Sequence, residues 1–168
     1  MKPVLAWITR SLATCGFLTY LPAHWKWGAK NWTGAGFIGT LAGLATCSVL
    51  QTSPFRCLLI LIGGTCLAIA VSDYAEELLG NPDDSRIVID EWIGYWFAIA
   101  FLPQALPMRI AAFVLFRLFD VVKPGWIRRA GGWPGGWGIV MDDVFAGILA
   151  NLLLQVSYYV YISGVRSG

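Results

Sequence analysis

The second half of the chain places five carboxylates beside apolar segments, in three groups that lie far apart in the sequence. The groups are Asp90 with Glu91, Asp120 alone, and Asp142 with Asp143. None of the other acidic residues precedes Asp73, so the first 72 residues carry no negative side chain at all. Acidic side chains in or beside membrane-spanning segments are costly and usually mark a functional site. We therefore expect these five carboxylates to hold a cation.

Two basic residues flank the central acid of this set. Arg117, Asp120 and Lys123 are spaced i, i+3 and i+6, which places them along one face of a helix. One interpretation is structural: Asp120 pairs with Arg117, and Lys123 extends to the surface. The other is functional: Asp120 holds a metal while Arg117 grips a phosphate through its fork of N–H groups and Lys123 adds a point charge.

The paired acids also allow two interpretations. Asp90 with Glu91, and Asp142 with Asp143, each stand where a helix is expected to open, and acids in a first turn stabilise a helix by about 0.3–1 kcal/mol. Two such pairs together with Asp120 favour a cation site instead. Mg²⁺ prefers oxygen ligands and retains several waters, so we expect Mg²⁺ as the cofactor.

The composition indicates a membrane protein. Hydrophobic residues make up 57% of the 168 residues and charged residues only 13%, against about 25% charged in soluble domains. Nine Trp and six Tyr fit the aromatic belts at the two membrane surfaces. We predict one all-α domain over residues 1–168, a polytopic bundle of four to five spans. The expected apolar segments are Ala35–Leu50, Cys57–Ser72, Trp92–Pro103, Ile110–Val122 and Val144–Ile162.

The segment Val4–Leu21 is interrupted by Arg10, so we expect a re-entrant or interfacial helix there. Four cysteines lie in apolar segments without a Cys-x-x-Cys pair, which favours buried apolar roles. Asn151 lies on a small-residue face of the last helix, where it either hydrogen bonds across the interface or merely packs.

Two polar stretches separate the apolar segments. The segment Asp73–Asp84 predicts a helix end followed by a loop, with the side chains of Asp73 and Glu76 exposed to water. Pro124–Gly138 contains six glycines in fifteen residues, which predicts a loop whose backbone bends sharply or approaches a neighbour closely.

Helix counting places all five carboxylates on one side of the membrane. Two crossings separate Asp90 from Asp142, and Asp120 ends the returning helix. The positive-inside rule then sets the orientation. The carboxylate side carries more basic residues, namely Lys123, Arg128 and Arg129, with Lys26 and Lys30, against Arg109 and Arg166 on the other side. We expect a bacterial inner-membrane protein whose site faces the cytoplasm.

Several function classes lack their usual residues. The net charge of +2 and the scattered basic residues exclude a nucleic-acid partner. The chain has no Cys-x₅-Arg, no Asp-x-Asp and no P-loop, and His24 is its only histidine. The remaining chemistry is an attack on phosphorus by a metal-activated water. The sequence does not indicate whether the protein is a monomer or an oligomer.

Three blocks, in order and with matching spacing, resemble the phosphatidylglycerophosphatase A family. They are Ile87–Gly94 around the Asp-Glu pair, Phe116–Pro124 around Asp120, and Gly135–Gly147 around the Asp-Asp pair. The segment Gly34–Leu41 departs from the family's glycine- and proline-rich motif and matches it only at Gly36, Gly39, Thr40 and Leu41.

The resemblance implies a Mg²⁺-dependent lipid phosphatase of the inner membrane. Its substrate would be phosphatidylglycerophosphate, and its products phosphatidylglycerol and inorganic phosphate. The implied catalytic and metal-binding residues are Asp90, Glu91, Asp120, Asp142 and Asp143, with Arg117 and Lys123 as the phosphate-binding residues. Two rival hypotheses use the same acids: a membrane cation carrier, and a phosphoalcohol transferase that takes a nucleotide-activated lipid.

Overall fold

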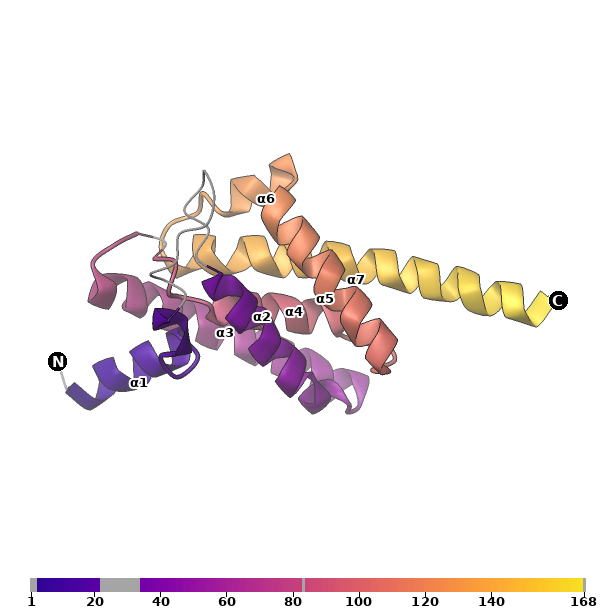
Figure 1. Cartoon of the computed structure of the whole chain (residues 1–168), viewed down its shortest axis with the longest axis horizontal. Coiled ribbons are helices and arrows are strands. Elements are labelled where there is room, and N and C mark those ends of the chain that lie inside the picture. The colour runs from indigo at the N-terminus through magenta and orange to yellow at the C-terminus, as the bar shows by residue number, and fades with distance from the viewer. Residues whose placement is uncertain (1–2, 22–33, 83, 168) are drawn as a thin grey trace.

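The computed structural model describes residues 3–21, 34–82 and 84–167, and every regular element in them is a helix. Of the residues considered in the sequence analysis, His24, Lys26, Lys30 and Asp83 lie outside these ranges. Figure 1 shows the arrangement. The elements are α1 (Pro3–Ala13), η1 (Leu18–Tyr20), α2 (Ala35–Thr46), η3 (Cys47–Leu50), α3 (Pro54–Leu79), α4 (Ile89–Ile99), α5 (Leu106–Val122), α6 (Gly125–Ala130) and α7 (Gly136–Ser167).

The short helix α4 forms the centre of the bundle. It packs against α2, α3, α5 and α7, and its side chains Tyr95 and Ile99 are fully buried. With 11 residues, α4 is about 16 Å long, whereas the hydrocarbon core of a bilayer is about 30 Å thick. The apolar segment Trp92–Pro103 therefore does not form a helix of spanning length, because the chain leaves the helix after Ile99. An enclosed helix does not need spanning length, since its neighbours cover it.

Small residues let α4 and α7 approach closely. A Cβ added at Gly94 would lie 2.9 Å from the backbone oxygen of Asp143, and one at Gly147 would lie 3.0 Å from the Cβ of Phe97. Farther along the same interface, the Asn151 side chain donates hydrogen bonds to the carbonyl oxygens of Ala98 (3.0 Å) and Ala100 (2.8 Å). Asn151 thus bonds across the interface and satisfies carbonyl groups at the end of α4.

Within the described residues, two helices are long and apolar enough to cross a membrane: α3, and α7 over Gly136–Val165. They leave large apolar side chains exposed, among them Leu58 and Ile62 on α3 and Leu152 and Val156 on α7. The C-terminal part of α7 extends well past the other helices (Figure 1). The segment Ala35–Leu50 is a shorter apolar helix.

The glycine-rich segment Pro124–Gly138 was expected to be a loop, and this prediction is wrong in part. It contains α6, and α7 already begins at Gly136. Asp142 and Asp143 therefore lie in the second turn of α7 and do not open it. The close approach expected of this backbone is present, because a Cβ at Gly136 would lie 2.8 Å from the backbone nitrogen of Asp73.

Asp73 is more than a solvated helix end. Its Oδ1 atom accepts a hydrogen bond of 3.1 Å from the backbone N–H of Gly136, the first residue of α7. The residue before it, Gly135, has a φ of +57°, a conformation that side chains disfavour. A side chain of α3 thus caps the N-terminus of α7 and fixes the start of that helix against α3.

The N-terminal segment forms a shorter helix than expected. Within Val4–Leu21, α1 ends at Ala13, and the chain then turns through positive φ values at Cys15 (48°), Gly16 (68°) and Phe17 (67°). Trp7 and other apolar side chains of α1 are exposed. Of the four cysteines, all of them free, Cys47 and Cys57 are buried as expected, Cys15 is half-buried and Cys66 is exposed on α3.

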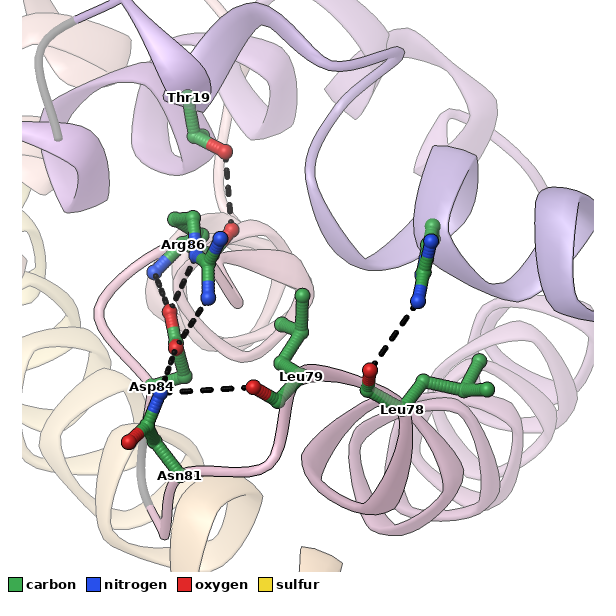
Figure 2. A network of polar contacts seen from close by, with 7 residues as sticks. Thr19, Leu78, Leu79, Asn81, Asp84 and Arg86 are labelled. Atoms are coloured by element: carbon green, nitrogen blue, oxygen red, sulfur yellow. Dashed lines mark hydrogen bonds and ion pairs between the residues drawn. The ribbon is translucent and has the colours of Figure 1, made fainter.

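A polar network orders the connection from α3 to α4 (Figure 2). The guanidinium of Arg86 donates to both carboxylate oxygens of Asp84, at 2.7 and 2.6 Å, and the hydroxyl of Thr19 donates to the Arg86 carbonyl at 2.9 Å. The side chain of Asn81 bridges the Leu79 carbonyl and Asp84. These bonds hold the chain directly before the first turn of α4.

We expect Asp84→Asn to lower the free energy of unfolding at pH 7 by about 0.5–1 kcal/mol, because it removes a partly exposed ion pair. Hydrogen bonds from Arg86 lower the pKa of Asp84 in the folded protein. The contribution is therefore complete above the unfolded-state pKa of about 3.9 and is lost as the pH falls through the folded-state value. Thermal unfolding in detergent at pH 7 and pH 3 measures this. A difference between variant and wild type that persists undiminished at pH 3 would contradict it.

Candidate functional site

Three segments that are distant in sequence meet at one end of the bundle. The first turn of α4 brings Asp90 and Glu91, the last turn of α5 brings Asp120, and the second turn of α7 brings Asp142 and Asp143. All five carboxylates are partly or largely buried. The structure thus brings together every acid that the sequence analysis singled out for the site.

Three of the acids form a compact group. Asp90, Glu91 and Asp143 each offer a carboxylate oxygen within 4.8 Å of the other two. The Asp143 side chain is almost completely buried, with 2% exposed. Three buried atoms, Oδ1 of Asp90, Oε2 of Glu91 and Oδ2 of Asp143, have no hydrogen-bond partner. Burial of an ionised carboxylate without a partner is strongly unfavourable, so this group calls for a cation.

The oxygens of this group suit Mg²⁺ in kind and in spacing. Mg²⁺ binds oxygen ligands at about 2.0–2.1 Å, so that ligands on opposite sides of one ion lie about 4.2 Å apart. The three carboxylate oxygens lie within 4.8 Å of one another, which small side-chain rotations bring to that separation. The kind of ligand and the spacing of one carboxylate oxygen from each residue therefore fit a hard divalent cation.

Lys123 holds the other acids together. Its Nζ lies 2.5 Å from Oδ2 of Asp142, 3.6 Å from Oδ1 of Asp120 and 3.8 Å from Oδ1 of Asp143. Burial lowers the pKa of Lys123, but the three carboxylates raise it by more, so that the net pKa lies above its ordinary value and the ammonium stays charged. The Lys123 side chain is 32% exposed, so it pairs with these carboxylates while remaining partly accessible to solvent.

Arg117 is held from two sides. Its Nη1 lies 2.8 Å from Oδ2 of Asp120 and donates a hydrogen bond of 3.3 Å to the hydroxyl of Thr40. The Thr40 hydroxyl in turn donates to the carbonyl of Gly36 at 3.0 Å. The pairing of Arg117 with Asp120 predicted from their spacing is present, and α2 supplies a second contact that the spacing did not predict.

The cluster carries more negative than positive charge. Five carboxylates face two cations, so full ionisation leaves an excess of three negative charges in a largely buried site. Like charges at this separation cannot all stay ionised in a low-dielectric environment unless a cation or protons neutralise them. The two ion-paired acids, Asp120 and Asp142, are already matched by Arg117 and Lys123. The buried oxygens without a hydrogen-bond partner lie in the group of Asp90, Glu91 and Asp143, although the other oxygen of Asp143, Oδ1, lies 3.8 Å from Nζ of Lys123.

Helix α2 contributes residues that the sequence analysis did not assign to the site. A Cβ at Gly36 would lie 3.0 Å from Cδ of Glu91 and 3.1 Å from Nη1 of Arg117, and one at Gly39 would lie 3.2 Å from Cβ of Glu91. These glycines let α2 pass directly over the site. With Thr40, they are among the few positions of Gly34–Leu41 that match the family motif, and that match was the available signal.

A cavity of about 280 Å³ opens beside the cluster. Asp90, Lys123 and Asp142 line one part of it, and Glu76 of α3 and Trp133 line another. Glu76 was expected to be a solvated helix end. Its place in the cavity could not be read from the sequence, because it depends on how α3 packs against α7.

Comparison with known proteins gives consistent matches. A family profile described as Phosphatidylglycerophosphatase A matches residues 11–158. A putative phosphatidylinositol-3-phosphatase of Bacteroides thetaiotaomicron is 40% identical over 87 residues, which cover 50% of this chain and 55% of that protein. Phosphatidylglycerophosphatase A of Escherichia coli is 32% identical over 132 residues, 74% of each chain.

Phosphatidylglycerophosphatase A of Haemophilus influenzae is 32% identical over 143 residues, which cover 82% of this chain and 80% of that protein. The chain thus spans about half the length of the Bacteroides relative and about three quarters or more of the other two. No solved structure matches the chain.

We expect Lys123→Met to lower the free energy of unfolding by about 1–3 kcal/mol, because it leaves three carboxylates without their shared cation. The side chain is 32% exposed, which keeps the loss below that of a fully buried pair. Arg129→Met is the matched control, since it removes a basic residue that is exposed on α6. Chemical unfolding in detergent without divalent cations measures both. Equal losses in the two variants would contradict the role given to Lys123.

Proposed function

Because the chain belongs to the phosphatidylglycerophosphatase A family, we propose that it removes the terminal phosphate of phosphatidylglycerophosphate, leaving phosphatidylglycerol and inorganic phosphate. Membership of this family makes the chain a phosphoric monoester hydrolase. One structural observation carries the assignment of the site: three carboxylates, each with a buried oxygen that has no hydrogen-bond partner, lie next to two cations.

In this proposal, Asp90, Glu91 and Asp143 hold Mg²⁺. Their unpartnered oxygens support that role, as does the excess of negative charge around them. A bound Mg²⁺ supplies charge neutralisation at the phosphate and lowers the pKa of a coordinated water. Asp120 and Asp142 complete the acidic site, where they form ion pairs with Arg117 and Lys123.

Arg117 and Lys123 bind the phosphate. Contacts with Asp120 and Thr40 fix the direction of the Arg117 guanidinium, so that its other N–H groups are preorganised for an anion. Lys123 lines the cavity and supplies a permanent positive charge there. Charge that is fixed before the substrate arrives stabilises the developing negative charge of the transition state without reorganisation.

The protein crosses the bacterial inner membrane several times in this proposal. The helices α3 and α7 have spanning length, and α2 and α5 also expose apolar side chains, such as Leu41 on α2 and Val114 on α5. These four helices surround α4, which lipid need not touch. Length and hydropathy support α3 and α7 as spans, and the proposal adds α2 and α5 on the basis of their exposed apolar side chains.

The site faces the cytoplasm in this proposal. Gln51 and Gln104, which are hydrogen bonded to each other, mark the end of the bundle opposite the carboxylates. More basic residues lie at the carboxylate end than at the other end, which the positive-inside rule assigns to the cytoplasm. They are Arg10, Arg86, Lys123, Arg128 and Arg129, against Arg56, Arg109 and Arg166.

A second substrate has specific support. The Bacteroides relative, which is the most identical of the three over its shorter aligned length, is named as a putative phosphatidylinositol-3-phosphatase. Phosphate release from both lipids by the purified protein decides between them. The cation-carrier and phosphoalcohol-transferase hypotheses are not favoured. A cation carrier, in particular, has no use for Arg117 and Lys123 within its acidic cluster.

We expect Asp90→Asn and Asp143→Asn each to reduce phosphate release at least about 100-fold, because each removes one charged oxygen from the proposed metal site. Purified protein in mixed micelles with phosphatidylglycerophosphate and Mg²⁺ provides the assay. Glu77→Gln, at an exposed position on α3, is the matched control and is expected to retain wild-type turnover. Wild-type rates in both Asp variants would remove the proposed site.

Binding of Mg²⁺ is tested independently of activity by thermal unfolding. We expect Mg²⁺ at about 100 times its Kd to stabilise the wild-type protein by about 2.7 kcal/mol, because the ion binds only the folded site. EDTA is expected to reverse the effect, and Asp143→Asn to abolish it. The proposal fails if Mg²⁺ stabilises the wild type and the variant equally.

A further inference from the structure

Glu76 is the acid that faces the site without a part in the proposed mechanism. It lies in the last turns of α3, half-buried, and lines the cavity together with Asp90, Lys123 and Asp142. Asp73, one turn earlier on the same helix, caps α7 and so fixes this end of α3 against the helix that carries Asp142. The next residue, Glu77, is exposed. The fold thus directs one acid of an adjacent pair into the cavity.

The Glu76 carboxylate cannot bind the phosphate itself, because two negatively charged groups repel each other. It can accept hydrogen bonds from hydroxyl groups, since its two oxygens offer about four lone-pair directions. A phosphate held at Lys123 places the carbon atoms next to it in the same cavity of about 280 Å³. That volume lies just below the usual range for sites of small organic ligands, about 300–1,000 Å³, so it suits a polar head group and not acyl chains.

We propose that Glu76 accepts a hydrogen bond from a hydroxyl on the carbon adjacent to the phosphate-bearing carbon, and so selects lipids whose phosphate monoester sits on a polyol. This inference rests on the proposed function. The head groups of phosphatidylglycerophosphate and of a phosphatidylinositol 3-phosphate both carry such a hydroxyl. Phosphatidate does not, because the oxygen on the carbon adjacent to its phosphate-bearing carbon is acylated. Lysophosphatidate regains the hydroxyl at the adjacent carbon.

The last two lipids therefore differ at the position that Glu76 is proposed to read. Hydrogen bonds to a charged group contribute enough to change binding about 10- to 100-fold. The wild-type protein is expected to prefer lysophosphatidate over phosphatidate in kcat/KM by that factor. Phosphatidylglycerophosphate serves as the reference substrate, and where either lipid is not hydrolysed, its inhibition constant against the reference replaces kcat/KM.

The variants are E76A, E76Q and the matched control E77A. We expect E76A to lower the preference for lysophosphatidate about 10- to 100-fold, and E77A to keep the wild-type preference. E76Q retains an acceptor oxygen without the charge, so its preference is expected to fall between those of the wild type and E76A. A graded response of this kind separates hydroxyl recognition from a merely structural role, which would reduce both lipids alike.

An unchanged preference in E76A, or an equal loss in E77A, would overturn the inference. A wild-type protein that releases no phosphate from phosphatidylglycerophosphate would instead contradict the proposed function. The two failures are distinguishable, because the dissociation constants of lysophosphatidate and phosphatidate, measured by direct binding to the wild type and to E76A, report on Glu76 even when no lipid is hydrolysed.

Discussion

Unbalanced negative charge in a largely buried site is the constraint on which the rest of this structure depends. Arg117 and Lys123 form ion pairs with Asp120 and Asp142. Among the described residues, no side chain hydrogen bonds to Oδ1 of Asp90, Oε2 of Glu91 or Oδ2 of Asp143. A fold would not retain three such oxygens for stability, because apolar residues of similar size would be less costly to bury. The charge is explained if the site is built to bind a divalent cation and, through it, an anion.

The architecture follows from bringing these groups together. Because α4 is short and enclosed, its first turn reaches the site without having to cross the bilayer on its own. Glycines at the helix crossings bring the backbones into contact, as Gly94 and Gly147 do between α4 and α7, and Gly36 leaves room for the side chains of Glu91 and Arg117. Asp73 fixes the start of α7 against α3, and Asn151 fixes a later turn of α7 against the end of α4. Packing and polar contacts thus act together to hold acids from three helices at one point.

The sequence was sufficient to predict the residues of the cluster, but not the boundaries of the helices that carry them. Counting helices between Asp90 and Asp142 predicted that these acids share one end of the bundle, because each crossing reverses the chain. The start of α7 at Gly136 was missed, since glycines favour loops in sequence and only the contact with Asp73 shows why they are helical here. Hydropathy likewise treated Trp92–Pro103 as a span, because it registers apolar character and not the turn after Ile99. The role of Glu76 depends on packing between distant helices, which no local pattern encodes.

The central claim is that Asp90, Glu91 and Asp143 bind one divalent cation. Anomalous scattering from crystals grown with Mn²⁺, which prefers the same oxygen ligands as Mg²⁺, tests it most directly. The account predicts an anomalous peak between these three carboxylates, within bonding distance of an oxygen from each. Mn²⁺ bound only elsewhere on the protein, with these three carboxylates left without it, would contradict the account.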